Sequence, residues 1–299
     1  MTGATCATGA TGRGRWREVG DRVFVRRHAS LDVNAGLVLG DDRCLVVDTR
    51  GSDREARELL DAVREVTALP FVVAVTHAHF DHCFGTATFA RAQPGCDVWG
   101  HEGCRADLAE HGEEQRAAMA TWLRQCGEEA LADEVAAAEL VPPNRTFTDA
   151  VTLGLGGRDV LLHHAGRGHT DHDVVADVVG AGVTFAGDLV EQGAPPSFDD
   201  SFPLEWPATL KALLPRLGQA VVPGHGDVVD PDFVASQLTD IAEVADVAAL
   251  QPRDADDEAL ERAASRLAVG GPAGYVGLRR ALIHLRGDRP GDSGDAPAP

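Results

Sequence analysis

Residues 76–82 read Thr76-His77-Ala78-His79-Phe80-Asp81-His82, a stretch that places three imidazoles and one carboxylate within six residues. The preceding run, 69–75, is apolar and too short for a helix, so we expect a buried strand that ends at the histidines. On extended backbone His77 and His79 project to the same side, whereas Asp81 and His82 follow where the chain bends into a helix expected over 83–91. The four side chains can therefore converge from two directions.

These side chains match the ligand preferences of borderline metals such as zinc, which favour neutral imidazole nitrogen and carboxylate oxygen. Four such groups within reach of one turn supply most of a coordination sphere. The alternative interpretation is a polar, solvated turn. In a chain with 12 histidines and 47 acidic residues among 299, the pattern H-x-H-x-[DE]-H is rare by chance. We therefore predict a metal site here.

The composition limits the possible partners of the chain. Its 44% apolar content suits a real hydrophobic core, and its length allows one large domain or two small ones. A formal charge of -20 with a single lysine, Lys211, argues against nucleic acid, because phosphate binding depends on basic residues. No run of 18 apolar residues occurs, so we expect no membrane segment and a cytoplasmic protein. A small-molecule substrate is the expected partner, and the sequence leaves the oligomeric state open.

The two ends of the chain are rich in small and polar residues, so we expect a disordered leader over 1–15 and a disordered tail over 287–299. A single domain is then predicted over 16–286. The six cysteines show no C-x-x-C spacing, which favours free thiols in a reducing compartment.

The strand and helix signals follow one another without a regular βαβ alternation. Strands are predicted at 23–26, 35–39, 44–47, 69–75, 97–99, 146–153, 159–163, 174–179, 183–186 and 220–222, the first three as an antiparallel meander. Helices are predicted at 54–66 and 83–91, in an insertion over 101–139, at 208–217 and in a C-terminal set over 231–286. A long loop over 191–207 is typical of a functional or disordered segment. This order favours a layered α/β sandwich over a doubly wound sheet.

Three further polar residues share one context, because each follows a β-type run and lies in a glycine-flanked turn. They are His169 in Gly168-His169-Thr170, Asp188 in Ala186-Gly187-Asp188 and His225 in Pro223-Gly224-His225-Gly226. Glycine lets the backbone and a ligating side chain approach closely. Each is a weak signal alone, with an ordinary loop residue as the alternative.

In this order, and together with His77-x-His79-x-Asp81-His82, these residues resemble the five-motif set of the metallo-β-lactamase-fold superfamily over roughly 23–230. The resemblance implies an αββα sandwich with two packed sheets, helices outside and the ligands on loops along one edge. It also implies two metal sites that share a bridging carboxylate. One site would use His77, His79 and His169, the second would use Asp81, His82 and His225, and Asp188 would bridge both.

Residues close to these ligands are candidates for holding them in place. Asp48, at the end of its strand, matches the superfamily's aspartate that braces the histidine-rich loop. Thr170, His172 and Asp173 lie close to His169 in the sequence and could support it. The remaining histidines match no motif position, and structural roles are favoured for them.

The resemblance implies a dinuclear zinc-dependent hydrolase that uses a metal-bound hydroxide on a small ester, thioester, lactone or amide-like substrate. Two Zn²⁺ ions are the expected cofactors, with iron or manganese as alternatives. Asp81, bound through one oxygen, would use the other to orient the hydroxide and to shuttle a proton to the leaving group.

The identity of residue 188 narrows the reaction. An aspartate there is the arrangement of glyoxalase-II-like thioesterases, lactonases and phosphodiesterases of the superfamily, whereas subclasses of true β-lactamases carry Cys or Ser, which disfavours β-lactam hydrolysis. Acyl-homoserine lactonases carry a Tyr soon after that aspartate, where this chain has Glu191. One alternative is a mononuclear iron oxidoreductase that resembles persulfide dioxygenases. Another is a metal-binding protein without turnover.

The walls of the substrate pocket are predicted to come from the 101–139 insertion and the 191–207 loop. Their aromatic side chains would suit an apolar acyl portion of the substrate, and they are Trp122, Phe198, Phe202 and Trp206. The alternative is that these aromatics pack in the core or between loops.

Overall fold

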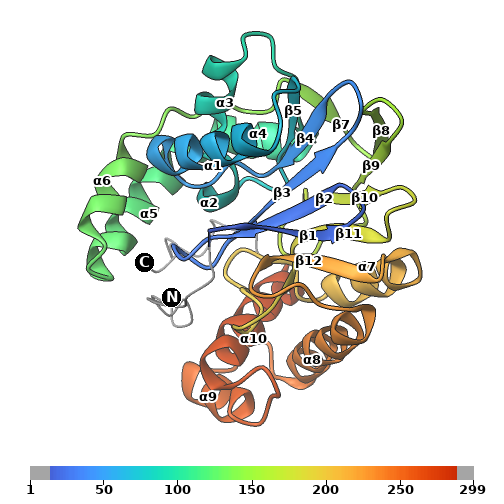
Figure 1. Ribbon diagram of the computed structural model, residues 1–299. Helices are drawn as coiled ribbons and strands as arrows, with labels where there is room; N and C mark the ends of the chain where they lie inside the picture. The colour runs from blue at the N-terminus through green and yellow to red at the C-terminus, as the bar shows by residue number, and fades with distance from the viewer. Residues whose placement is uncertain (1–13, 288–299) are drawn as a thin grey trace.

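Short β-type runs separated by turns pair into two sheets, of seven and five strands, in the computed structural model, which describes residues 14–287. The sheets pack face to face and helices cover both outer sides (Figure 1), so the predicted αββα sandwich is confirmed. Apart from residues 14, 15 and 287, the predicted leader and tail lie outside the described residues.

The larger sheet begins as a meander and ends with parallel strands. Strands β1 to β4 pair antiparallel in chain order, which agrees with the predicted meander and adds β1 to it, and β4 to β7 pair parallel. The strands are β1 (Trp16–Gly20), β2 (Val23–Arg27), β3 (Asn34–Leu39), β4 (Cys44–Val47), β5 (Phe71–Ala74), β6 (Val98–His101) and β7 (Arg145–Phe147).

The smaller sheet is antiparallel except at one edge. Strands β8 to β11 pair antiparallel with their neighbours, whereas β11 and β12 run parallel because a helical crossover separates them. The strands are β8 (Ala150–Gly154), β9 (Asp159–His163), β10 (Val175–Val178), β11 (Val183–Glu191) and β12 (Ala220–His225).

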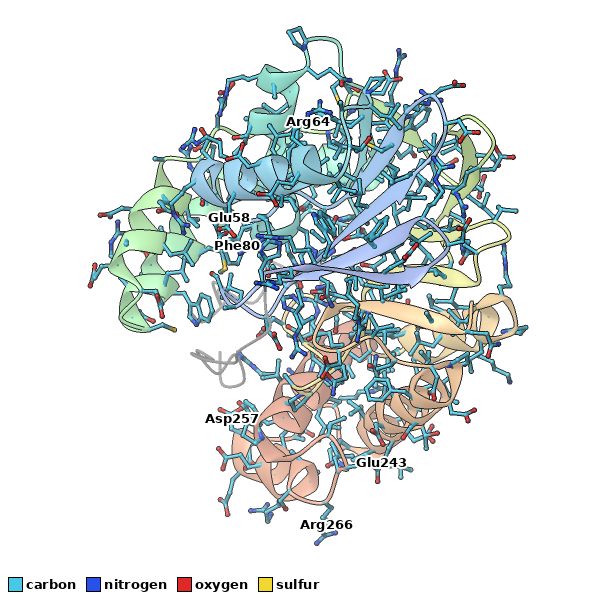
Figure 2. All side chains as sticks on the ribbon, in the orientation of Figure 1. Glu58, Arg64, Phe80, Glu243, Asp257 and Arg266 are labelled. Atoms are coloured by element: carbon cyan, nitrogen blue, oxygen red, sulfur yellow. The ribbon has the colours of Figure 1, made fainter. Side chains whose placement is uncertain are left out.

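The helices divide into two layers (Figure 1). Those from the first half of the chain pack with the larger sheet, and they are α1 (Asp53–Val66), α2 (Phe80–Cys83), α3 (Thr86–Ala92), α4 (Glu102–Glu110), α5 (Gly112–Gln125) and α6 (Glu129–Ala136). Those from the second half pack with the smaller sheet, and they are α7 (Trp206–Leu213), the 3₁₀ turn Leu214–Arg216, α8 (Pro231–Leu250), α9 (Asp257–Ala264) and α10 (Gly271–Arg286). Asp257, the first residue of α9, and Arg266, in the turn that follows this helix, are exposed and point away from this layer (Figure 2).

Helix α1 shows how local sequence and packing agree. The side chain of Ser52 caps the helix by accepting a hydrogen bond from the backbone N–H of Glu55. Ala56, Leu59 and Val63, spaced three and four residues apart, bury one face in the core over the larger sheet. Burial of one such leucine stabilises the fold by about 1.5–3 kcal/mol. The short connection between β4 and α1 is thereby fixed at its helical end.

Two predicted elements are wrong in their continuity. The strand predicted over 146–153 is two strands, β7 and β8, which belong to different sheets, because the chain turns at Thr148 and Asp149 and crosses between them. The helix predicted over 83–91 is interrupted between α2 and α3. The N–H of Gly85 donates to the carbonyl oxygen of Arg50 at 2.8 Å, and the carbonyl oxygen of His82 accepts from the N–H of Thr49 at 2.7 Å. The β4–α1 connection therefore takes hydrogen-bonding groups that a continuous helix would use.

Two further boundaries differ from the prediction. Strand β1 was not predicted, since its sequence lacks an apolar alternation. Strand β11 does not stop at residue 186 but continues as far as Glu191, with register shifts around Gly187. None of the helices within residues 14–287 combines the length and the apolarity that crossing a membrane requires.

The contact between the sheets is close enough to be tested at one glycine. Gly36 of β3 faces the ring of Phe185 of β11, and a Cβ at residue 36 would overlap that ring. Gly36→Ala should therefore lower the free energy of unfolding by about 1–3 kcal/mol, because an overpacked interface must shift. Urea denaturation followed by circular dichroism measures the change. Gly271→Ala, whose Cβ would meet nothing within 4 Å, is the control and should not lower it; equal losses in both variants would contradict this account.

Candidate metal centre

The seven predicted ligands meet at one edge of the sandwich. His77 and His79 follow β5, His225 is the last residue of β12, and Asp188 lies in β11 beside it. His169 comes from the turn between β9 and β10. The structure therefore brings together side chains from both sheets, in two neighbouring groups.

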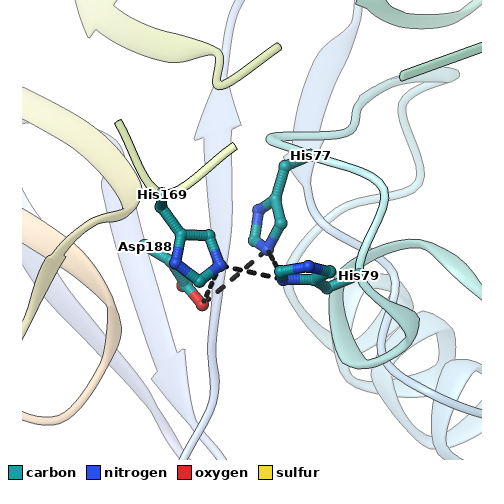
Figure 3. Close-up of side chains that lie close together, drawn as sticks. All are labelled: His77, His79, His169 and Asp188. Atoms are coloured by element: carbon teal, nitrogen blue, oxygen red, sulfur yellow. Dashed lines mark hydrogen bonds and ion pairs between the residues drawn. The ribbon is translucent and has the colours of Figure 1, made fainter. Parts of the chain in front are cut away.

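The first group consists of His77, His79, His169 and Asp188, which point toward one another (Figure 3). Nδ1 of His79 lies 3.0 Å from Nε2 of His77 and 2.8 Å from Nε2 of His169. Oδ2 of Asp188 lies 3.7 Å from Nε2 of His77 and 3.5 Å from Nε2 of His169. Ligand atoms about 2.0–2.1 Å from a tetrahedral zinc ion lie about 3.3 Å apart, so the spacing fits one ion.

The second group consists of Asp81, His82 and His225. Nε2 of His82 and Nε2 of His225 are 3.3 Å apart, and Oδ2 of Asp81 lies 3.8 Å from the former and 3.4 Å from the latter. Asp188 contacts this group as well, with Oδ1 3.3 Å from Nε2 of His82 and Oδ2 3.3 Å from Nε2 of His225. Asp188 therefore occupies the position of a carboxylate shared by both groups.

Hydrogen bonds within the protein cannot satisfy these atoms. Nδ1 of His79 carries at most one hydrogen, so it can donate to only one of the two imidazole nitrogens that face it. Oδ1 of Asp188 is buried and lacks a hydrogen-bond partner among residues 14–287, which is unfavourable for a carboxylate oxygen. A divalent cation among the converging lone pairs would remove both conflicts. The donors thus fit metal ions.

Two glycines allow Asp188 to take its place. Gly187 has a φ of 54°, and the ladder between β11 and β12 is irregular on both sides of it. Such a bulge changes the direction in which the next side chain points. A Cβ at Gly224 of β12 would overlap Oδ1 of Asp188. The close approach predicted for the glycine-flanked turns therefore occurs at residue 224.

Asp48 ties the histidine-rich loop to β4. It has a φ of 63°, a left-handed conformation that is uncommon outside glycine. Its Oδ1 accepts a hydrogen bond from the N–H of Thr76 at 2.8 Å, and its Oδ2 accepts from Oγ1 of Thr76 at 2.9 Å and lies 2.8 Å from Nδ1 of His82. Oγ1 of Thr76 lies 3.0 Å from Nδ1 of His77 and accepts from it, which leaves Nε2 of His77 unprotonated toward the centre. Asp48 thus holds the loop as the resemblance implies.

The sequence analysis missed three partners of the ring nitrogens, of which Thr76, on Nδ1 of His77, is described above. Nε2 of His79 lies 2.9 Å from Oδ2 of Asp200, and Nδ1 of His225 lies 2.8 Å from the carbonyl oxygen of Leu31. Each contact fixes the ring and leaves its other nitrogen facing the centre. Asp200 lies in the long loop predicted to be functional, but nothing in the sequence distinguishes it from Asp199. Leu31 acts through its backbone, which leaves no side-chain signal.

The turn that carries His169 is shaped by two of the three residues predicted to support it, Thr170 and Asp173. Asp173 accepts hydrogen bonds from the N–H and the hydroxyl of Thr170 at 2.9 and 2.7 Å. Nδ1 of His169 has no hydrogen-bond partner within the described part of the chain, and Oε1 of the buried Glu191 lies 3.9 Å from it. Hydrogen bonds therefore hold the turn, whereas Nδ1 of His169 lacks, within residues 14–287, the partner that the far nitrogens of the other four rings have.

His172 supports the histidine-rich loop rather than His169. Its Nε2 accepts a hydrogen bond from the N–H of Ala78 at 3.1 Å, so its Nδ1 carries the hydrogen and donates to Oδ1 of Asp171 at 2.8 Å. On the other side of the same residue, Nε2 of Gln115 donates to the carbonyl of Ala78 at 3.2 Å. The backbone between the first two ligands is thereby fixed at both of its polar groups.

A comparison with known protein families agrees with this geometry. The profile described as the metallo-beta-lactamase superfamily matches residues 30–276, which is well over half of the chain and includes all seven clustered residues. The chain belongs to the metallo-beta-lactamase superfamily.

Individual members of the superfamily share only 20–30% sequence identity with the chain where they match it. The metallo-beta-lactamase type 2 of Bacteroides fragilis is 30% identical over 90 residues, and the match covers 28% of this chain and only 36% of that protein. Two solved structures, a metallo-beta-lactamase from Pontibacter korlensis and the DIM-1 metallo-beta-lactamase, each have a TM-score of 0.61 and 20% identity. The match with the Pontibacter korlensis structure covers 76% of this chain, and the match with DIM-1 covers 78% of it. Each match covers 98% of the other chain. At that identity the likeness shows the fold.

In the metal-free protein, nearby carboxylates raise the pKa of the two more exposed imidazoles of the centre, His79 and His225. Burial alone would lower the pKa of His79, but Asp200 and Asp188 outweigh it and raise the pKa to about 9. Burial likewise opposes the charge on His225, and Asp188 and Asp81 raise its pKa to about 10. Both rings are therefore positively charged imidazolium groups at pH 7 when no metal is bound.

The three more deeply buried rings, His77, His82 and His169, differ in the direction of their pKa shifts. At His82 burial is again outweighed, chiefly by Asp188, and the pKa lies well above its usual value. At His77 burial prevails and the pKa lies well below its usual value, and at His169 burial lowers the pKa to about 4. Three of the five clustered histidines are thus protonated at neutral pH without metal, and two are neutral.

The aromatics predicted to line a pocket are mostly buried. Trp122 is 9% exposed in the core over the larger sheet, and Phe198 and Trp206 are 1% and 0% exposed in the core over the smaller sheet. Phe202 is half-buried. The ring of Trp206 lies 5.9 Å from that of His169, so it packs behind a ligand. These positions agree with the packing alternative for three of the four residues.

Metal loading should release protons, because metal ions bind unprotonated imidazole. Filling both groups at pH 7 should release about three protons, one each from His79, His82 and His225, whose pKa values lie above 7 in the metal-free protein. For the same reason the apparent affinity should fall as the pH is lowered and should rise with pH through about 9 and 10, the pKa values of His79 and His225. Calorimetric zinc titrations in two buffers of different ionisation enthalpy measure the proton count.

The control for this titration is His111→Gln, which removes an exposed histidine outside the centre and should leave the count unchanged. Release of fewer than one proton by the wild-type protein would contradict the charge states described above.

Gly224→Ala should impair metal binding, because the added Cβ would displace the carboxylate of Asp188 from its shared position. We expect the variant to retain at least one ion fewer per chain than the wild type after dialysis, measured by plasma mass spectrometry. Gly271→Ala is the matched glycine control, and circular dichroism of the metal-free proteins checks folding. Full metal content in a folded Gly224→Ala variant would contradict the role of residue 224.

Proposed function

We propose that the chain is a dinuclear zinc-dependent hydrolase of a small ester, thioester, lactone or amide-like substrate. The observation that carries this proposal is Asp188, whose carboxylate faces two sets of imidazoles at once. Two ions bound there would lower the pKa of a shared water toward about 7 and polarise the substrate carbonyl. Neither a single ion nor a purely structural cluster requires a carboxylate placed between two sets of ligands.

Some residues of the chain would bind the ions, and others would orient the imidazole rings that bind them. One ion would be held by His77, His79, His169 and Asp188, and the other by Asp81, His82, His225 and Asp188. The far nitrogens of four of the five rings already have a hydrogen-bond partner. Because these partners fix the ring directions in advance, little rearrangement accompanies binding or reaction.

Asp81 is the residue to which we assign proton transfer. Its Oδ2 faces the nitrogens of His82 and His225, and its side chain is 11% exposed, so it is not completely shielded from solvent. A carboxylate in this place can accept a proton from the attacking water and deliver it to the leaving group. It can do so without leaving the site, since both oxygens belong to one rigid group.

The substrate approaches from one side. The side chains of His79 and His225 are 24% and 19% exposed, whereas those of His77, His82 and His169 are at most 2% exposed. The reacting bond of a small molecule must therefore lie over the edge formed by the first two residues. The net charge of -20 disfavours polyanionic substrates, which supports a small neutral or weakly charged partner.

Hydrolysis of β-lactams ranks behind the other reactions in this proposal. The relatives named as metallo-beta-lactamases match the chain over a short segment or at 20% identity. According to the resemblance described above, subclasses of true β-lactamases carry Cys or Ser where this chain has Asp188. An aspartate there supports an ester, thioester or lactone as the primary substrate.

Metal content and a substrate panel test the proposal together. Protein purified without added metal should contain about two zinc ions per chain, and it should hydrolyse at least one of a chromogenic ester, thioester, lactone, phosphodiester and cephalosporin. One iron ion per chain with oxygen uptake would overturn the proposal in favour of the mononuclear iron oxidoreductase. Two zinc ions without turnover of any substrate would favour metal binding without catalysis.

Asp81→Ala should lower kcat by about 10²–10⁴-fold on any substrate that the wild type turns over, because the variant lacks the proton acceptor. The fold should persist, as judged by circular dichroism. Asp254→Ala, which removes an exposed aspartate between α8 and α9, serves as the control and should keep wild-type kcat. Wild-type turnover in Asp81→Ala would remove Asp81 from the mechanism.

A further inference from the structure

The loop between β11 and α7 supplies a carboxylate to the metal centre. Oδ2 of Asp200 lies 2.9 Å from Nε2 of His79, the nitrogen on the far side of the ring from the centre. The side chain of Asp200 is 60% exposed. An exposed ion pair holds its partner weakly, since water competes and the side chain is free to turn. Asp200 can therefore orient His79 only if its backbone is fixed by something else.

Helix α10 fixes that backbone. Nη2 of Arg280 donates to the carbonyl oxygen of Asp200 at 2.7 Å, and Nε of the same guanidinium donates to the carbonyl oxygen of Ser201 at 2.8 Å. Two hydrogen bonds from one planar group to successive carbonyls set both the position and the direction of the loop. The side chain of Arg280 thus clamps the loop at the residue that contacts His79.

Aromatic contacts hold the loop to α10 on either side of Asp200. Before it, the ring of Phe198 packs so closely on α10 that a Cβ at Gly277 would lie 3.1 Å from it. After it, the ring of Phe202 lies 5.1 Å from that of His284 and 5.9 Å from the guanidinium of Arg280. The loop is therefore docked on α10, and the clamp acts on a segment that is already in place.

We propose that Arg280 is a positioning residue of the metal centre, which acts through the backbone of Asp200 to orient His79 and so makes helix α10 part of the site. This inference rests on the ligand role that the proposed function gives to His79, but not on the reaction. A carboxylate behind a ligating histidine changes metal affinity by about 10–100-fold when it is removed. Loss of the clamp should produce an effect of the same kind.

Two properties of Arg280 are separable by substitution. Its charge lies near the Asp200 carboxylate, whereas its geometry supplies two donors to two carbonyls. Arg280→Lys keeps the charge and loses the paired donors, and Arg280→Met loses both. If the clamp is what matters, the two variants should behave alike. Arg286→Ala is the matched control, because this arginine lies on the same helix but its Nε donates to the carbonyl of Arg253.

The test is a zinc titration of the metal-free full-length protein in competition with a chromogenic chelator. We expect Asp200→Asn and Arg280→Met each to weaken one of the two sites by about 10–100-fold. Arg280→Lys should match Arg280→Met, and Arg286→Ala should match the wild type. The double variant Asp200→Asn/Arg280→Met should be no weaker than Asp200→Asn alone, since both changes break one relay. The melting temperature of each metal-free protein checks that the variants are folded.

Several outcomes would overturn the inference. Wild-type zinc affinity in a folded Arg280→Met or Arg280→Lys variant would show that the clamp does not act on the centre. Effects that add in the double variant would mean that Arg280 and Asp200 act separately. The proposed hydrolase fails independently of this relay if the wild type binds two zinc ions and turns over no substrate, in which case the affinities of the variants still decide the role of Arg280.

Discussion

The carboxylate of Asp188 is the constraint on which the rest of the arrangement depends. It lies 3.3 to 3.7 Å from nitrogens of four different imidazoles. Ionisable groups buried this closely are stable only when each is paired, because desolvation is not offset otherwise. The backbone yields to this requirement: β11 bulges at Gly187 so that the side chain can turn, and Gly224 of β12 leaves room for its oxygen. The strand geometry at this edge is therefore set by the site as much as by the sheet.

Much of the fold could be predicted because its signals are local. The apolar run before His77, the meander and the capped helix after Ser52 each follow from a few adjacent residues. The errors arose where the decision depends on distant partners. Residues 146–153 carry one continuous strand pattern, yet the chain changes sheets in the middle of them, and only the position of the other strands determines that. Likewise, a helical sequence is interrupted near Gly85 because its backbone bonds to Thr49 and Arg50, which are far away in the sequence.

In the site, too, the residues with a local sequence signal could be predicted and those that depend on distant partners could not. Its seven converging side chains could be predicted because few residue types bind zinc well, His and Asp among them, and their motifs are rare by chance. Their supports could be predicted only in part. Asp48 follows a strand as the superfamily's pattern requires, whereas Asp200 is one of several acids in a loop, and Leu31 contributes a carbonyl that any residue would offer. Apolar and aromatic residues are ambiguous for a related reason, since Trp206 would look the same in a pocket wall as in the core where it lies.

Because the supports come from separate segments, no local piece of the chain can form the centre alone. His82 depends on the end of β4, His225 on the connection between β2 and β3, and His79 on a loop held by α10. Because distant elements fix the directions of the ligand side chains before any ion binds, less free energy is needed to order these side chains on binding. Ions that bind only this arrangement would in turn stabilise the fold over the unfolded chain. The two sheets and the C-terminal helices are then coupled through one centre, so a helix that carries no motif residue can still govern metal affinity.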